Sequence, residues 1–219
     1  MSPRFQAVVF DFDYTLVDSS RAVIACANYA LGKLGLPPAS DEAICQTIGL
    51  SLPEVLVQLA GEEQRDKGEA FQRYFVSLSD RVGNPLTVLL QPTSATIQAL
   101  RRCGQRLGIV STKMRYRMEG LLRREGLLSH FDVIIGLEDV PAPKPDPVGL
   151  LLAVERLGLT KDACLYVGDS LVDAETASRA GVPFLAVLTG KTEAAAFAAY
   201  PKVGVASSVA EVPVVVGCA

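Results

Sequence analysis

The chain has 219 residues, a formal net charge of −3 and an isoelectric point near 5.3, and 49% of its residues are hydrophobic. This length and apolar content are sufficient for one large globular domain or for a domain with an insertion. The basic residues are scattered, which argues against a nucleic-acid groove, and no apolar run reaches the roughly 18 residues of a membrane span. The first apolar run ends too early for a signal peptide, and the five cysteines form no CxxC pair. We therefore expect a soluble, cytoplasmic protein.

The chain begins with an apolar run, residues 7–13 (AVVFDFD), which we interpret as a buried strand. The following stretch, residues 17–83, contains no β-rich run and shows helical spacing throughout. We interpret it as an all-helical insertion that forms a second small domain. Residues 1–16 and 84–219 would then form the main domain.

The second half of the chain alternates strand-like and helical segments, which is typical of βαβ units with a parallel sheet. Further strands are predicted at residues 106–111, 131–136, 164–169 and 183–189. Helices are predicted between them at residues 92–103, 115–125, 147–157 and 171–180. A glycine follows each helix where a C-cap requires positive φ: Gly104, Gly126, Gly158 and Gly181. In the insertion, N-cap positions are held by Ser19 or Ser20, Ser40 and Ser51.

Two aspartates end the first predicted strand. In an extended strand, residues i and i+2 point the same way, so Asp11 and Asp13 could present both carboxylates to one site. Open α/β sheets bind ligands at this end of their strands. Carboxylates held close together repel each other, and a hard divalent cation would offset that repulsion.

Further polar residues are predicted at the same edge of the sheet. Ser111 ends the strand in GIVSTK, Asp169 ends the strand in CLYVGD, and Asp173 follows one helical turn later. Lys144 lies between two prolines in PAPKPDP. Each has a structural alternative, because serine and aspartate cap helices and lysine is common in solvated turns. Together they would supply a hydroxyl, an ammonium group and carboxylates along one edge of one sheet.

The order and spacing of these motifs resemble those of the haloacid dehalogenase superfamily. DFDYT looks like the family's D-x-D-x-T motif, Ser111 like its Ser/Thr motif, Lys144 like its basic motif and GDSLVD like its acidic motif. The stretches STKMR, FDVIIGLEDV, KPDP and YVGDSLVDAETASRAGV are similar to the branch of phosphoglycolate phosphatases and related pyrophosphatases. The resemblance implies an α/β fold, a Rossmann-like parallel sheet with an inserted all-helical (C1-type) cap domain.

The chemistry that the resemblance implies is Mg²⁺-dependent hydrolysis of a small phosphomonoester such as 2-phosphoglycolate. Asp11 would be the nucleophile and would form an aspartyl-phosphate. Asp13 would be the general acid and base. Ser111 and Lys144 would bind the phosphoryl oxygens, whose negative charge grows in the transition state.

The resemblance also implies the metal and substrate contacts. The Asp11 carboxylate, the Asp13 backbone carbonyl and Asp169 would hold Mg²⁺, and Asp173 would support the site indirectly. Substrate-binding residues would be Tyr14, Thr15, Ser111, Thr112 and Lys144, together with Gly49, Leu50 and Ser51 from a loop of the insertion.

Tyr14 departs from the family pattern, which has glycine after the second aspartate. Tyrosine adopts positive φ only at a steric cost. Either the backbone at Tyr14 has an ordinary conformation, or the ring has a role of its own, and the sequence leaves both open.

Alternative functions share most of these motifs. An inorganic pyrophosphatase and a sugar-phosphate mutase of the same superfamily remain open. A receiver-type phosphorylation switch also combines carboxylates, a hydroxyl and a lysine, but it would need neither Asp13 nor the helical insertion. The expected partner is a small phosphorylated metabolite, with no nucleic acid and no membrane, and the chain is expected to be a monomer or homodimer.

Overall fold

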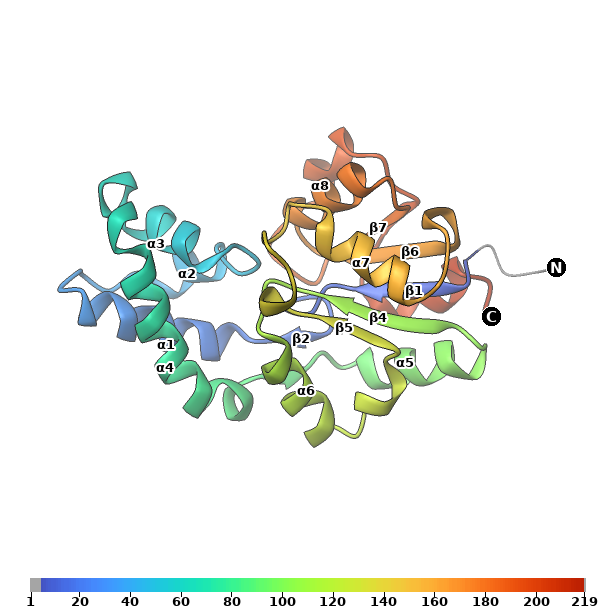
Figure 1. The fold of residues 1–219 in the computed structure, drawn as a ribbon, viewed down its shortest axis with the longest axis horizontal. Coiled ribbons are helices and arrows are strands. Elements are labelled where there is room, and N and C mark those ends of the chain that lie inside the picture. The colour runs from blue at the N-terminus through green and yellow to red at the C-terminus, as the bar shows by residue number, and fades with distance from the viewer. Residues whose placement is uncertain (1–4, 219) are drawn as a thin grey trace. The chain divides into compact units, whose positions relative to one another are not determined.

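The computed structural model describes residues 5–218, which divide into two compact units (Figure 1). The core unit runs up to Val17 and resumes at Leu89, and the helical unit spans Asp18–Val88. The sequence-based interpretation ended the insertion at Gly83. In the structure, helix α4 (Gly68–Leu86) continues beyond that glycine, so the chain re-enters the core unit a few residues later.

The core unit contains a six-stranded sheet in the order β5-β4-β1-β6-β7-β8, in which every neighbouring pair is parallel. The strands are β1 (Ala7–Phe10), β4 (Arg106–Val110), β5 (Val133–Ile135), β6 (Cys164–Gly168), β7 (Phe184–Val187) and β8 (Gly204–Ala206). The last residue of β1, Phe10, is in register with Ile109 and Val167 on its two sides. The residues that follow β1 therefore emerge in the middle of the carboxyl edge.

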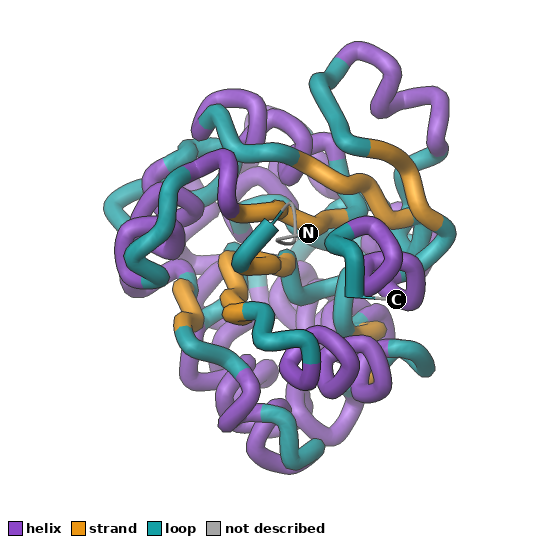
Figure 2. Tube along the Cα trace, turned by 90° about the vertical axis from the view of Figure 1, so that its right-hand side faces the viewer, coloured by secondary structure: helices purple, strands orange, loops and turns teal. Residues whose placement is uncertain are grey.

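Helices cover both faces of this sheet (Figures 1 and 2). They are α5 (Thr93–Arg102), α6 (Arg115–Arg124), α7 (Val148–Arg156), α8 (Leu171–Ala180) and α9 (Val212–Val215). Short 3₁₀ turns occupy Leu128–His130, Leu137–Asp139, Lys161–Ala163, Ala194–Ala199 and Val209–Glu211. Val8 and Phe10 pack with residues of α5, α6 and α9, whereas Ala7 and Val9 pack with residues of α7 and α8. Both faces of β1 are thus buried, which explains its unbroken apolar sequence.

The predicted elements of the core unit are confirmed, with shifts at their ends. Each of the four glycines after a predicted helix has positive φ, between 64° at Gly158 and 77° at Gly104. The strand predicted to reach Asp13 ends at Phe10, and β8 was not predicted. Because β8 is a three-residue edge strand with the half-exposed Val205 at its centre, its sequence carries little hydrophobic signal.

The helical unit has a hydrophobic core of its own. It contains α1 (Ser20–Lys33), α2 (Asp41–Cys45), α3 (Leu52–Ala60), the turn Glu62–Lys67 and α4. Its buried residues are Cys26, Ala27, Ala30, Leu31, Ile44, Val55, Leu56, Phe71 and Phe75. The predicted N-cap positions are Ser19, Ser40 and Ser51, of which Ser40 accepts a cap hydrogen bond from the Ala43 N–H. The chain passes between the units through β2 (Val17–Asp18) and β3 (Val88–Leu89), which form a two-stranded sheet.

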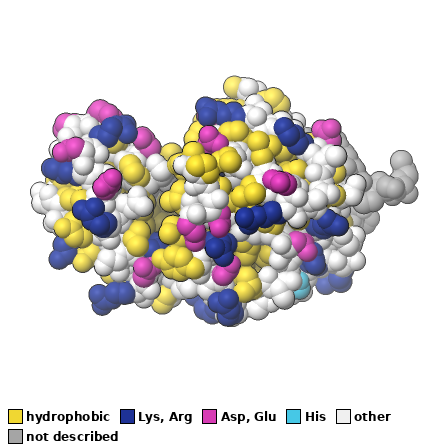
Figure 3. Space-filling model, viewed as in Figure 1, with side chains coloured by type: hydrophobic (Ala, Val, Ile, Leu, Met, Phe, Trp, Pro, Cys, Tyr) yellow, Lys and Arg dark blue, Asp and Glu magenta, His cyan; other side chains and the backbone are white. Residues whose placement is uncertain are grey.

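Two features bear on the expectation that the protein binds neither nucleic acid nor membrane. On the face of the core unit drawn in Figure 3, Lys and Arg side chains are interspersed with Asp and Glu side chains. None of the helices within residues 5–218 has the length and hydrophobicity that crossing a bilayer requires.

Gly108 tests the packing of β4 against β5. A Cβ at this position would lie 2.8 Å from Val133 Cγ1. We expect Gly108→Ala to lower the free energy of unfolding by about 1–3 kcal/mol, because the β-branched neighbour cannot move aside. Val133→Ala removes the obstructing methyl groups. A double-mutant cycle by urea unfolding should therefore give a coupling of about 1 kcal/mol or more, and additive effects would contradict this packing.

Candidate active site

The chain turns sharply after β1. The Asp11 N–H still donates to the Val167 carbonyl at 2.8 Å, but sheet pairing ends there. Three residues later, the Tyr14 N–H donates to the Val17 carbonyl at 2.7 Å. Among residues 5–218, Tyr14 is the non-glycine residue with positive φ, at 61°. This turn, at residues 14–16, follows both aspartates that the sequence placed on one strand.

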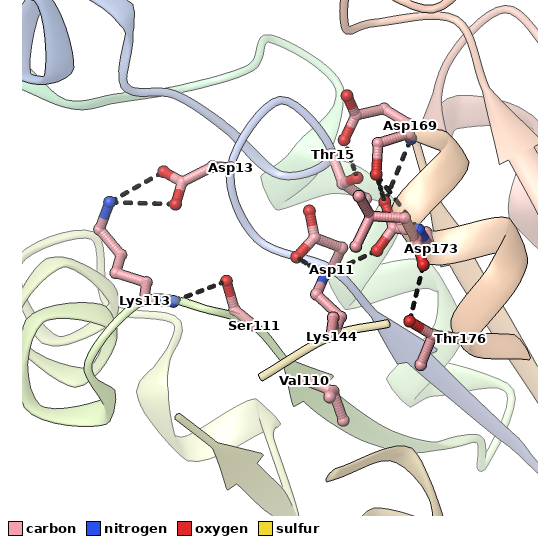
Figure 4. A network of polar contacts seen from close by, with 12 residues as sticks. Asp11, Asp13, Thr15, Val110, Ser111, Lys113, Lys144, Asp169, Asp173 and Thr176 are labelled. Atoms are coloured by element: carbon pink, nitrogen blue, oxygen red, sulfur yellow. Dashed lines mark hydrogen bonds and ion pairs between the residues drawn. The ribbon is translucent and has the colours of Figure 1, made fainter. Parts of the chain in front are cut away.

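Lys144 joins the first aspartate to a second carboxylate. Its ammonium donates to Asp11 Oδ1 at 2.7 Å and to Asp173 Oδ1 at 2.6 Å (Figure 4). The Tyr166 hydroxyl, from β6, donates to the same Asp173 oxygen at 2.8 Å. The side chain of Lys144 is only 5% exposed. It lies in the loop before α7, so three segments distant in sequence meet at one buried ammonium group.

Asp169 follows β6 and completes the cluster. The Thr15 hydroxyl donates to Asp169 Oδ1 at 3.0 Å. Gly190, in the loop after β7, approaches the other oxygen so closely that a Cβ there would lie 1.8 Å from Asp169 Oδ2. A side chain at position 190 would therefore force the Asp169 carboxylate to move.

The three carboxylates of Asp11, Asp169 and Asp173 are buried, and each offers an oxygen within 4.8 Å of the others. Burial raises the pKa of Asp11 to about 7, and Asp173 adds to the rise, although Lys144 opposes it. The pKa of Asp169 is raised well above its usual value by burial and by the two other carboxylates. Burial lowers the pKa of Lys144, but Asp11 and Asp173 together hold it well above its ordinary value. One ammonium group does not balance three buried carboxylates.

This all-oxygen cluster could bind a hard divalent cation, because such a cation would supply the missing positive charge. The hydrogen bonds favour Asp11 and Asp169 as direct ligands. Asp173 is already engaged: its Oδ1 accepts from Lys144 and Tyr166, and its Oδ2 accepts from the Ser170 N–H and hydroxyl.

A second polar group lies beside this cluster (Figure 4). The Lys113 ammonium donates to both carboxylate oxygens of Asp13, at 2.9 and 3.1 Å. The Ser111 hydroxyl, which follows β4, accepts from the Lys113 N–H at 3.3 Å. The strand expected to reach Asp13 ends at Phe10, so both aspartates lie just beyond it. The two carboxylates contact different ammonium groups.

Lys113 is the residue that sequence reasoning missed. It stands two positions after Ser111, at the carboxyl end of β4. Ser111 was selected as a polar residue just beyond a predicted strand. The same rule would have selected Lys113, the third residue of the motif Ser-Thr-Lys.

The structure distributes the predicted site residues over three places. The buried cluster brings together Asp11, Thr15, Lys144, Asp169 and Asp173. Asp13 and Ser111 lie with Lys113, and Thr112 stands between Ser111 and Lys113 in the chain. The turn between α2 and α3 in the helical unit holds Gly49, Leu50 and Ser51, whose contact with substrate stays a prediction.

The backbone at Tyr14 decides one of the alternatives left by the sequence. An ordinary conformation is wrong, since φ is 61°. Left-handed backbone at an L-residue costs roughly 1–2 kcal/mol. The turn is held by the Tyr14 N–H bond to Val17 and by the Thr189 hydroxyl, which donates to the Tyr14 carbonyl at 2.5 Å. Tyr14 as a whole is 7% exposed.

A parallel α/β sheet with buried carboxylates and a paired lysine at its carboxyl edge is the architecture of an enzyme with a candidate cation site. Residues 8–187 match the model of the haloacid dehalogenase-like hydrolase family, and the chain belongs to this family.

Individual relatives support the assignment. Phosphoglycolate phosphatase of Salmonella paratyphi A is 32% identical over 212 residues, which cover 85% of this chain and 82% of that protein. The Escherichia coli K12 phosphoglycolate phosphatase is 31% identical over 210 residues, covering 84% and 82%. The crystal structure of a haloacid dehalogenase-like hydrolase from Bacteroides fragilis matches with a TM-score of 0.92 and 41% identity, over 95% of this chain and 99% of that one. The expected fold and the expected enzyme class, a phosphatase of this family, are confirmed.

The strain at Tyr14 predicts an inverted order of stability. Tyr14→Gly and Tyr14→Ala both remove the buried ring, but glycine adopts positive φ without a steric penalty. We expect the glycine variant to be more stable than the alanine variant by about 1 kcal/mol in urea unfolding. Tyr116, in helix α6, is the control position. There the alanine variant should be more stable than the glycine variant by about 1 kcal/mol, because alanine favours helix. If the alanine variant at position 14 were as stable as the glycine variant or more stable, the backbone strain at Tyr14 would be contradicted.

Proposed function

We propose that the protein is a Mg²⁺-dependent phosphatase that hydrolyses a small phosphomonoester, such as 2-phosphoglycolate, through an aspartyl-phosphate. The observation that carries this proposal is the buried ammonium of Lys144, which joins Asp11 to Asp173 beside Asp169. The names of the curated relatives support the substrate class.

Asp11 is the proposed nucleophile. It directly follows the central strand, its backbone is bonded to β6, and Lys144 fixes one of its carboxylate oxygens. The other oxygen would attack phosphorus in line as the bond from phosphorus to the leaving oxygen breaks. When bound, Mg²⁺ supplies positive charge to the buried carboxylates and the phosphoryl oxygens.

Asp13 is the proposed proton shuttle. It would give its proton to the leaving oxygen and then take one from the water that hydrolyses the acyl phosphate. Ser111 would donate a hydrogen bond to the phosphoryl oxygens, and the Lys144 ammonium would place a positive charge beside them, where negative charge develops. We also propose that the helical unit acts as the family's cap domain, and that Gly49, Leu50 and Ser51 contribute to substrate choice.

The proposal predicts phosphate release from 2-phosphoglycolate that depends on Asp11. Asp11→Asn should lower turnover by at least about 10³-fold, because the amide is nearly isosteric but forms no acyl phosphate. Phosphate release should be measured with 2-phosphoglycolate, pyrophosphate, sugar phosphates and nucleotides. Asp162→Asn, on the exposed turn before β6, is the matched control and should be fully active.

The outcomes separate the candidate functions. A clear preference for pyrophosphate, or isomerisation of a sugar phosphate without phosphate release, would replace the phosphomonoesterase proposal by one of its alternatives. Turnover of Asp11→Asn near the wild-type rate would refute the aspartyl-phosphate itself.

The metal part of the proposal is tested at Gly190. Activity should disappear in EDTA and return with Mg²⁺. Gly190→Ala should raise the Mg²⁺ concentration for half-maximal activity by about 10-fold or more, because the new methyl group displaces the Asp169 carboxylate. Asp169→Ala should have a larger effect of the same kind. Gly204→Ala is the control, because its Cβ would lie 3.6 Å from Leu185 Cδ1, an ordinary contact. An unchanged Mg²⁺ requirement in folded Gly190→Ala would contradict the assignment of Asp169.

A further inference from the structure

We propose that Lys113 is a specificity residue that selects substrates whose leaving group carries its own negative charge. This inference rests on the proposed function, because it uses the assignment of Asp13 to the leaving group. It concerns a residue of the core unit, whereas the proposed function places substrate choice in the helical unit.

The position of Lys113 follows from its contact with Asp13. A general acid must lie within about 3 Å of the oxygen that it protonates. Lys113 Nζ lies 2.9 and 3.1 Å from the two Asp13 carboxylate oxygens. With Asp13 as the acid, the Lys113 ammonium would therefore lie within two hydrogen-bond lengths of the leaving oxygen.

The two ammonium groups of the site have different surroundings. Lys144 is 5% exposed and is bonded to two carboxylates inside the cluster. The side chains of Lys113 and Asp13 are 17% and 12% exposed. Lys144 thus belongs to the buried, phosphoryl-binding part, and Lys113 belongs to the more accessible part, where the remainder of a substrate must lie.

The backbone holds Lys113 in place. Its N–H donates to the Ser111 hydroxyl at 3.3 Å, and its carbonyl accepts from the Leu137 N–H at 3.1 Å. Its ammonium also lies 6.0 Å from the centre of the Phe12 ring, within the range of a cation–π contact. Because both the backbone and the side chain of this lysine are already held, its ammonium group loses little conformational freedom when it binds a second anion.

The ammonium retains capacity for a substrate oxygen. Lysine has three N–H donors, and the contacts with Asp13 use two of them. Among the described residues, Asp13 is the acidic side chain that pairs with Lys113. A carboxylate or phosphate attached next to the leaving oxygen could accept the third N–H, whereas an uncharged alkyl or amide leaving group would gain much less. The substrate class is therefore small phosphoesters or phosphoanhydrides with an acidic leaving group.

The test compares two nearly isosteric substrates. In 2-phosphoglycolate the leaving group ends in a carboxylate, and in 2-phosphoglycolamide it ends in a neutral amide. The wild-type enzyme should prefer the carboxylate by roughly 10- to 100-fold in kcat/KM, as expected for a charge-assisted hydrogen bond. Lys113→Met should remove most of this preference, mainly through KM for 2-phosphoglycolate. Lys113→Arg should largely retain it. Lys161→Met, on an exposed turn, is the matched control and should leave the ratio unchanged.

Each outcome has a distinct meaning. If Lys113→Met lowers kcat/KM equally for both substrates, the lysine only orients Asp13 and the specificity role is refuted. If the wild-type enzyme does not distinguish the two substrates, the role is refuted without any variant, even if Lys113→Met fails to fold. If the wild-type enzyme hydrolyses neither substrate, the proposed function itself fails.

Discussion

The burial of three carboxylates around one ammonium group is the constraint on which the rest of the site depends. Lys144 bonds to Asp11 and Asp173, but it leaves Asp169 and a net negative charge uncompensated in a region without solvent. Folding alone would neutralise such a cluster by protonation, which is the meaning of the raised pKa of Asp11. A bound cation would instead keep Asp11 ionised, and only the ionised form is a nucleophile. The same charge imbalance thus links stability, metal binding and reactivity.

The hydrogen bonds around this cluster assign its members unequal roles. Both carboxylate oxygens of Asp173 already accept hydrogen bonds, from Lys144, Tyr166 and Ser170. Within residues 5–218, the side-chain hydrogen bond to Asp169 comes from the Thr15 hydroxyl, and Gly190, in the loop after β7, lies against the other carboxylate oxygen. Two aspartates only four residues apart therefore differ in what they can bind, because one caps helix α8 and the other directly follows a strand.

Much of the core unit could be predicted because its signals are local. Buried parallel strands have continuous apolar sequences, and a glycine marks the end of each predicted helix. The predicted end of the first strand, at Asp13, was wrong for an identifiable reason. Phe12 continues the apolar pattern and is fully buried, although it lies beyond the sheet. The turn there depends on Tyr14, whose left-handed backbone is stabilised by Thr189, a residue 175 positions away. No local pattern reports such a contact. The charge cluster was partly predictable from strand ends, but the pairing of Lys113 with Asp13 requires three-dimensional placement.

The way in which the helical unit is inserted has an evolutionary consequence. The chain leaves the core unit and returns to it through β2 and β3, which pair with each other, so the two ends of the insertion are neighbours. Every side chain of the carboxylate cluster and of the Lys113 pair comes from outside the insertion. The inserted segment also has its own hydrophobic core. Natural selection can therefore lengthen, shorten or rebuild those helices without replacing any residue of the carboxylate cluster or of the Lys113 pair.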